Sequence, residues 1–112
     1  MSPITTHILD VAAGQPARGV EVVLDRLGDD GWASVGRGTT NDDGRVADLM
    51  EEGSISAGTY RLTFATKAYF DGKQTTSFYP EVAVTFCVEA EAEHYHVPLL
   101  LSPFGYSTYR GS

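Results

Sequence analysis

The sequence predicts an all-β protein whose short strands pack as a sandwich or a barrel. Apolar and polar residues alternate with a period of two in several short segments, as they do in half-buried strands. Clusters of Gly, Pro, Asn and Asp separate these segments at intervals of roughly 8–12 residues, which is typical of all-β folds. The expected turns lie at 13–16, 28–31, 41–44, 53, 57–58, 71–72 and 103–105.

Three strands are expected in the N-terminal half of the chain. Side chains alternate between the two faces of a strand, so the first strand has one face of Ile4, Thr6, Ile8 and Asp10 and another of Thr5, His7, Leu9 and Val11. The second strand, at 19–27, places Val20, Val22 and Leu24 on one side. A short third strand is expected at 32–37.

Three further strands are expected in the C-terminal half, at 60–65, 82–89 and 94–101. In the last of them, one face carries Tyr95, Val97, Leu99 and Leu101, and the other carries His94, His96, Pro98 and Leu100. One short helix is predicted at 66–72, where Lys67, Ala68 and Phe70 are acceptable helix formers.

The length and charge indicate one soluble domain that covers residues 1–112. A chain of 112 residues can bury a core without disulfides. Its net charge of −7 argues against a nucleic-acid partner, which would need clustered Lys and Arg. No apolar stretch approaches the roughly 18 residues of a membrane span, and residues 1–12 do not resemble a secretory signal. We therefore expect a cytoplasmic protein.

The single cysteine, Cys87, has no partner for an internal disulfide. It follows Val84, Thr85 and Phe86 in a strand-like segment, and free cysteines are commonly buried. We expect Cys87 to be a buried structural residue, in keeping with a reducing compartment.

The three histidines, His7, His94 and His96, are the main candidates for chemistry. If the large apolar residues face the core, His7 and His96 point outward together with Leu9 and Leu100. They could be ordinary solvated histidines. An outer face that also carries apolar side chains is more typical of a cleft or a subunit interface.

Other chemistries have weaker support. The spacing of His94 and His96 would suit a metal, with Cys87, Glu89 or Glu93 as further ligands, but no recognised ligand spacing is present and no metal is expected. The sequence contains neither a Gly-x-Ser-x-Gly nucleophile motif nor a phosphate-binding glycine loop. Arg45 and Arg110 are either surface arginines or clamps for an anion or a carbonyl. The remaining possibility is general acid–base catalysis by histidine, with arginine stabilising an oxyanion.

Four segments together are similar to one family over Ile4 to Ser112: ITTHILD at 4–10, TTNDDGR at 39–45, HYHVPLLLSP at 94–103 and YRGS at 109–112. They resemble the 5-hydroxyisourate hydrolases, transthyretin-related enzymes that hydrolyse an intermediate of urate breakdown. The ending from Tyr109 to Ser112 is the family's most specific mark and distinguishes it from transthyretin itself, the hormone carrier.

The resemblance implies a transthyretin-like sandwich of two antiparallel sheets, with about eight strands and one short helix. It also implies a homotetramer, a dimer of dimers with active sites in the channel between the dimers. The family's catalytic positions fall on His7, Arg45, His96 and Ser112. Substrate binding falls on Arg45, Tyr109 and Ser112, whereas His94 is a neighbour without such a role.

The implied reaction is hydrolysis of 5-hydroxyisourate to 2-oxo-4-hydroxy-4-carboxy-5-ureidoimidazoline, in which water attacks a ring amide. No metal or organic cofactor is needed. The residues leave open whether His7 or His96 takes the proton from water; we favour His7 acting with Ser112. Two alternatives remain: a transthyretin-like carrier of a small ligand, and a monomeric adhesive or carbohydrate-binding module. For the second, Trp32 alone is weak support as an aromatic binding surface.

Overall fold

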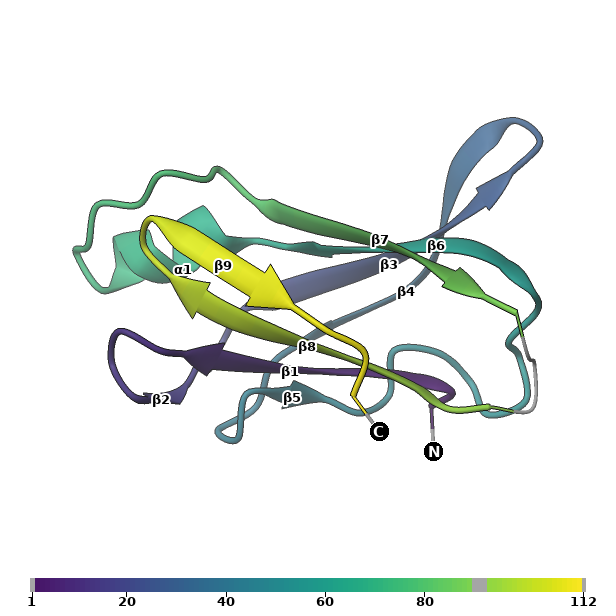
Figure 1. The fold of residues 1–112 in the computed structure, drawn as a ribbon, viewed down its shortest axis with the longest axis horizontal. Helices are drawn as coiled ribbons and strands as arrows, with labels where there is room; N and C mark the ends of the chain where they lie inside the picture. The colour runs from purple at the N-terminus through teal and green to yellow at the C-terminus, as the bar shows by residue number, and fades with distance from the viewer. Residues whose placement is uncertain (1, 90–92, 112) are drawn as a thin grey trace.

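The computed structural model describes residues 2–89 and 93–111, which form two β-sheets that face each other and one short helix (Figure 1). The predicted all-β sandwich is therefore confirmed. The elements are β1 (Ile4–Asp10), β2 (Gln15–Pro16), β3 (Glu21–Gly28), β4 (Gly31–Thr39), β5 (Arg45–Val46), β6 (Gly58–Phe64), α1 (Thr66–Gly72), β7 (Val82–Val88), β8 (Tyr95–Ser102) and β9 (Gly105–Thr108).

The first sheet has the order β2-β1-β8-β9, and β5 also pairs with β1. One pair departs from the expected antiparallel arrangement, because β1 and β8 run parallel, with Ile4 opposite Tyr95 and Asp10 opposite Leu101. A parallel pair needs a long crossover connection. Here the whole second sheet and the helix lie in the chain between the two strands (Figure 1).

The second sheet has the order β4-β3-β6-β7, and all of its pairs are antiparallel. The register between β3 and β4 shifts between Leu24 and Asp25, where the structure has a β-bulge or a similar irregularity. This sheet supplies the second half of the core.

The core lies between the two sheets and follows the alternation predicted from the sequence. In β1, the face that carries Ile4 and Ile8 is buried and the face that carries Thr5 and His7 is half-exposed. Most of the predicted inner faces of the other long strands are likewise buried, at Val22, Leu24, Tyr60, Leu62, Phe64, Val82, Val88, Tyr95, Val97, Leu99 and Leu101. Val84 and Phe86 of β7 are only half-buried, and Pro98, predicted on the outer face of β8, is buried. Their burial removes the apolar surface that drives the two sheets together.

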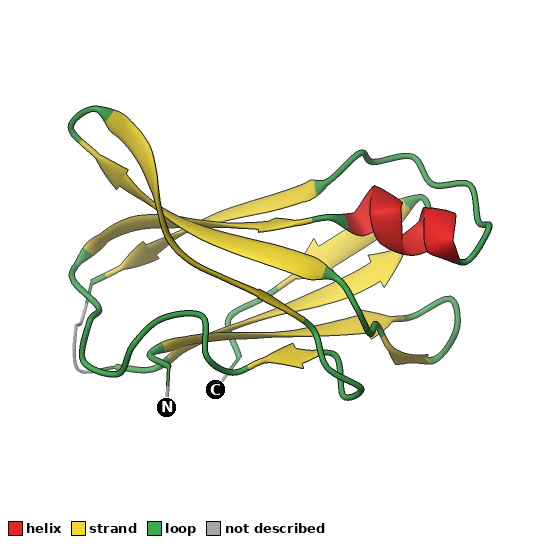
Figure 2. Cartoon of the chain, turned by 180° about the vertical axis from the view of Figure 1, so that it is seen from behind, coloured by secondary structure: helices red, strands yellow, loops and turns green. Residues whose placement is uncertain are grey.

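The helix α1 has the predicted bounds and packs at one end of the sandwich (Figure 2). Its Phe70 is buried in the core, and its Tyr69 hydroxyl donates a hydrogen bond of 2.8 Å to a carboxylate oxygen of Asp10. Asp10 is only 2% exposed. The Tyr69 bond, a second one of 3.0 Å from the amide of Ala13 and the ammonium of Lys73 at 3.6 Å compensate for burying its charge.

The sequence did not predict the short strands β2 and β5 or the strand β9, and the prediction for Cys87 was wrong. Cys87 is exposed, because β7 is an edge strand and the alternation turns position 87 away from the core side that carries Val88. Among the described residues, no helix is long and apolar enough to cross a membrane.

Candidate active site

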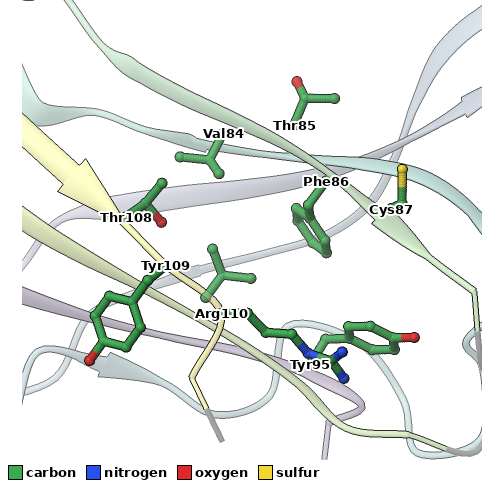
Figure 3. Close-up of a pocket in the computed structure, with 9 residues that line it drawn as sticks. Val84, Thr85, Phe86, Cys87, Tyr95, Thr108, Tyr109 and Arg110 are labelled. Carbon is green, nitrogen blue, oxygen red and sulfur yellow. The ribbon is translucent and has the colours of Figure 1, made fainter.

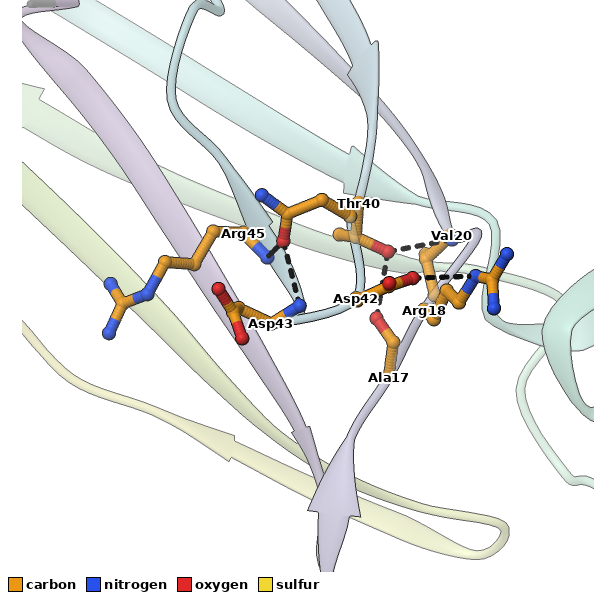
Figure 4. A network of polar contacts seen from close by, with 8 residues as sticks. Ala17, Arg18, Val20, Thr40, Asp42, Asp43 and Arg45 are labelled. Carbon is orange, nitrogen blue, oxygen red and sulfur yellow. Dashed lines mark hydrogen bonds and ion pairs between the residues drawn. The ribbon is translucent and has the colours of Figure 1, made fainter.

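A tight turn ahead of β5 sets the backbone of Arg45. The side-chain oxygen of Asn41 accepts hydrogen bonds from the amides of Asp43 (2.9 Å) and Arg45 (3.0 Å), and the amide of Asn41 bonds back to the carbonyl of Arg45 (3.1 Å). Such side-chain acceptance is the usual role of Asn in turns. The Arg45 side chain extends away from this network (Figure 4), so its guanidinium is free to meet a ligand.

The same turn is anchored to β1. The carbonyl of Gly44 accepts a hydrogen bond of 2.8 Å from the amide of Ile8. Gly44 has a φ of +74°, and a Cβ built there would collide with the carbonyl oxygen of Ile8. Only glycine suits this backbone conformation and this close approach.

The pairing of three strands gathers the predicted residues on the outer face of the first sheet. His7 of β1 is the register partner of Arg45 in β5, and Thr5 of β1 is the register partner of His96 in β8. The structure therefore brings His7, Arg45 and His96 into one neighbourhood, although the three are far apart in the sequence.

A hollow of about 450 Å³ opens on this face. Its lining combines polar side chains with a larger share of apolar surface and comes from β1, β5, β8 and the residues beside them: Thr5, Thr6, Arg45, Val46, Ala47, His94 and His96. Arg45 and His94 are exposed, whereas Thr5 and His96 are half-buried. Of the predicted site residues, Arg45 and His96 line the hollow, and His7 lies beside it on the same face without lining it.

His96 is held by hydrogen bonds and has a perturbed pKa. Its Nδ1 lies 2.9 Å from the Thr5 hydroxyl oxygen. Burial lowers the pKa of the His96 imidazole, the nearby Arg45, His94 and His7 lower it further, and a hydrogen bond with the Thr5 backbone partly opposes them. The ring is therefore biased toward its neutral form, which can accept a proton.

The C-terminal segment runs back to His96. The amide of Gly111 donates a hydrogen bond of 2.7 Å to the carbonyl of His96, and a Cβ built on Gly111 would lie 2.6 Å from His96 Cδ2. Arg110 is tied to Glu93 by an ion pair of 2.8 Å, and its guanidinium lies 4.4 Å from the centre of the Tyr95 ring. Ser112, the last predicted site residue, lies outside the described residues.

Tyr109 does not line the hollow of His96 in this single chain. It lines a second hollow, of about 230 Å³, between β7 and the β8–β9 side of the first sheet, together with Phe86, Cys87 and Arg110. Figure 3 shows the Arg110 guanidinium beside the Tyr95 ring, while the neighbouring Tyr109 side chain points in another direction. In this single chain Tyr109 is 58% exposed and does not line the hollow of His96.

The sequence analysis missed two residues next to His96. Thr5 contacts the ring directly, and Gly111 leaves room for it. Strand alternation had placed Thr5 on the same face as His7, which indicated that Thr5 could lie near the site. Its contact with His96 could not be predicted, because it depends on the parallel register of β1 and β8. No three His, Cys, Asp or Glu side chains come together as possible metal ligands within residues 2–89 and 93–111.

The arrangement combines a proton acceptor with an anion-binding group. A half-buried imidazole with a lowered pKa can remove a proton from water, and a nearby guanidinium can stabilise negative charge on a carbonyl oxygen. Together they suit hydrolysis at a polarised carbonyl.

Comparison with known proteins places this chain in a family. The family model described as "HIUase/Transthyretin family" matches residues 4–111. The chain is 50% identical over 109 residues to the 5-hydroxyisourate hydrolase of Salmonella dublin, covering 97% of this chain and 80% of that protein. The structure of Klebsiella pneumoniae 5-hydroxyisourate hydrolase superposes with a TM-score of 0.86 at 38% identity, over 97% of this chain and 92% of that one.

The fold is also similar to that of a transthyretin. Sea bream transthyretin, crystallised in complex with thyroxine, superposes with a TM-score of 0.93 at 36% identity, over 98% of this chain and 95% of that one. Since the family model covers nearly the whole sequence and the matched hydrolase is 50% identical, the chain belongs to the HIUase/Transthyretin family.

Proposed function

We propose that this protein is a 5-hydroxyisourate hydrolase of urate degradation. The observation that carries the proposal is the hollow in which Arg45 and His96 meet on the outer face of the first sheet. The 50% identity to a hydrolase of that name supports the choice of substrate. The product is 2-oxo-4-hydroxy-4-carboxy-5-ureidoimidazoline, formed when water attacks a ring amide and opens the ring.

Each predicted site residue has a proposed role. Arg45 binds the electron-rich edge of the substrate and stabilises the developing oxyanion, for which its planar guanidinium with five donors is suited. His7 and His96 exchange protons with water and substrate. The sequence favoured His7 with Ser112 as the acceptor, whereas the lowered pKa of His96 makes its neutral ring a capable acceptor as well. Tyr109 and Ser112 bind substrate. The reaction needs no metal ion or organic cofactor.

We further propose that the protein works as a homotetramer, a dimer of dimers with the site between the dimers. Leu9 and Leu100 lie half-buried on the face that carries the hollow, and Val11 at the end of β1 is 48% exposed. Apolar side chains around the hollow favour a partner surface there. A cytoplasmic location is in keeping with the free Cys87.

The decisive experiment mixes the purified protein with freshly generated 5-hydroxyisourate and follows the loss of its ultraviolet absorbance. We expect decay well above the spontaneous rate, and a fall of about 10²–10⁴-fold when His96→Asn removes an acid–base group. Decay at the spontaneous rate would rule out the proposal. Activity that persists in His96→Asn would rule out the assignment of His96.

The second candidate is a carrier of a small aromatic ligand, favoured by the TM-score of 0.93 with thyroxine-bound transthyretin. Titration calorimetry with thyroxine separates the two candidates. The hydrolase proposal expects catalysis without tight thyroxine binding, and the carrier predicts the reverse. Size-exclusion chromatography also tests the tetramer against a monomeric binding module.

A further inference from the structure

Thr5 lies between two imidazole rings at the edge of the hollow. Its hydroxyl oxygen is 2.9 Å from Nδ1 of His96 and 3.0 Å from Nε2 of His94. The two rings are nearly parallel, with an interplanar angle of 19° and centroids 6.4 Å apart. The parallel register places Thr5 directly opposite His96, and so one hydroxyl bridges both histidines.

A threonine hydroxyl has a single proton, so it can donate to only one of the two rings. The other ring must then donate its own N–H to the hydroxyl oxygen. Two arrangements satisfy this condition. In the first, His96 Nδ1–H donates to Thr5 and Thr5 donates to His94. In the second, His94 Nε2–H donates to Thr5 and Thr5 donates to His96.

The two arrangements differ at the nitrogen that matters for chemistry. Because Thr5 engages Nδ1 of His96, Nε2 is the nitrogen left for water or substrate. In the first arrangement, a neutral His96 carries its proton on Nδ1, and Nε2 keeps a lone pair that can accept a proton. In the second, the proton is on Nε2 and the neutral ring cannot act as a base.

We propose that Thr5 and His94 are positioning residues that set the tautomer of His96. A neutral His94 accepts the Thr5 proton, which holds His96 in the form with a free Nε2. A protonated His94 has no lone pair to offer, so it favours the second arrangement, in which the Thr5 proton turns to His96: a proton leaves Nδ1 of His96 to solvent, and Nε2 takes one. The importance of this switch for turnover rests on the proposed hydrolase function.

Other charged and titratable groups around the two rings also influence which nitrogen of His96 carries a proton. Arg45 on β5 and His7 on β1 disfavour a proton on His96, and the Glu93–Arg110 ion pair lies beside His94 in the chain. The lowered pKa of His96 keeps its ring neutral at a pH where ordinary imidazoles become charged.

The first test reads the tautomer directly, without turnover. Long-range proton–nitrogen correlation spectra of the imidazoles should show His96 protonated on Nδ1 at alkaline pH, and then on Nε2 as His94 takes up a proton. Thr5→Ser, which keeps the hydroxyl, should retain this change. Thr5→Val should abolish it. His94→Gln, which can donate or accept but does not titrate, should make the His96 tautomer independent of pH until His96 itself is charged.

The second test measures kcat and KM for 5-hydroxyisourate across pH. Thr5→Val should lower kcat about tenfold, which is near the upper end for one net hydrogen bond, and leave KM unchanged. Thr5→Ser should restore kcat. His94→Gln should remove the part of the acid limb that follows the titration of His94. Thr63→Val is the matched control: Thr63 is also a half-buried strand threonine, but it lies on β6 in the other sheet, and its replacement should change nothing.

A His96 tautomer that is the same in wild type, Thr5→Val and His94→Gln at every pH would overturn the proposal. An unchanged kcat in Thr5→Val would also overturn it. If the wild-type protein has no hydrolase activity, the proposed function fails, but the spectra still decide the tautomer. If Thr5→Val does not fold, the exposed His94→Gln replacement still decides it, because a pH-dependent switch that survives without His94 refutes its role.

Discussion

The amide of Gly111 donates a hydrogen bond of 2.7 Å to the carbonyl oxygen of His96, so the C-terminal segment lies against the candidate site. The two residues form a single antiparallel bridge, which joins Gly111 to His96 of β8 outside the strand pairings of the sheet. Arg110 reinforces it through Glu93 and Tyr95. The segment therefore forms part of the surroundings of the His96 ring.

Gly111→Ala is expected to damage activity more than stability. The added Cβ would lie 2.6 Å from His96 Cδ2, so either the ring or the segment must move. A displacement of about 1 Å in a catalytic group can cost on the order of 10²-fold in rate. We expect kcat/KM for 5-hydroxyisourate to fall by about that factor, with a small change in Tm. Gly105→Ala is the control, since its Cβ would lie 3.7 Å from Ser102 Oγ in ordinary contact. Equal rates in both variants would show that the Gly111 contact is unimportant.

Arg45→Ala should abolish most of the activity and leave the fold intact. The Arg45 side chain is exposed, so its loss should change the free energy of unfolding by less than about 0.5 kcal/mol. Loss of one oxyanion-stabilising group should lower kcat by about 10²–10³-fold. After burial, Arg45 is the next largest influence that lowers the pKa of His96, so the pKa should rise in this variant.

Enzyme assays and an NMR titration of His96 measure both effects. Arg18→Ala is the matched control, because Arg18 forms an exposed ion pair of 2.9 Å with Asp42 in the same turn. An unchanged His96 pKa in Arg45→Ala would contradict the electrostatic coupling between the two residues.

Gly44→Ala should destabilise the protein through both backbone strain and a collision. Gly44 has a φ of +74°, and its Cβ would meet the Ile8 carbonyl. Strain of this kind costs about 1–3 kcal/mol before the collision is added. Each kcal/mol lowers Tm by roughly 4–8 °C in a small domain. Gly14→Ala separates the two contributions, since Gly14 has a φ of +71° but nothing within 4 Å of a Cβ. Equal shifts of Tm in the two variants would mean that the contact with Ile8 costs nothing.

The stability should fall in acid partly because of His96. Its folded-state pKa is lowered, chiefly by burial, so as the pH drops the unfolded chain takes up this proton before the folded chain does. Protonation then favours unfolding. The contribution of His96 to the free energy of unfolding is fully present above the ordinary imidazole pKa of about 6.5. It is lost as the pH falls through the pKa of His96 in the folded protein. Urea unfolding from neutral to acid pH should show a shallower decline in His96→Asn than in the wild type. An equal decline of the unfolding free energy with falling pH in both proteins would contradict this role of His96.

Much of the candidate site could be predicted from strand alternation. Because side chains point to opposite faces of a strand in turn, the apolar positions in β1 and β8 were enough to place His7 and His96 outward. The same rule turned Cys87 away from the core side, although its exposure also required β7 to be an edge strand. The strand β9 was missed because its four residues carry little apolar alternation and gain their order by pairing with β8.

The sequence alone determined the six longer strands, the helix from Thr66 to Gly72 and the direction of most of their side chains, because these depend on neighbours a few residues apart. The tertiary structure decided which strands pair and in which register. The parallel β1–β8 pair sets Thr5 against His96, and the β1–β5 pair sets His7 against Arg45. These pairings follow from packing two sheets over a shared core and closing backbone hydrogen bonds across the whole chain, which no local pattern encodes.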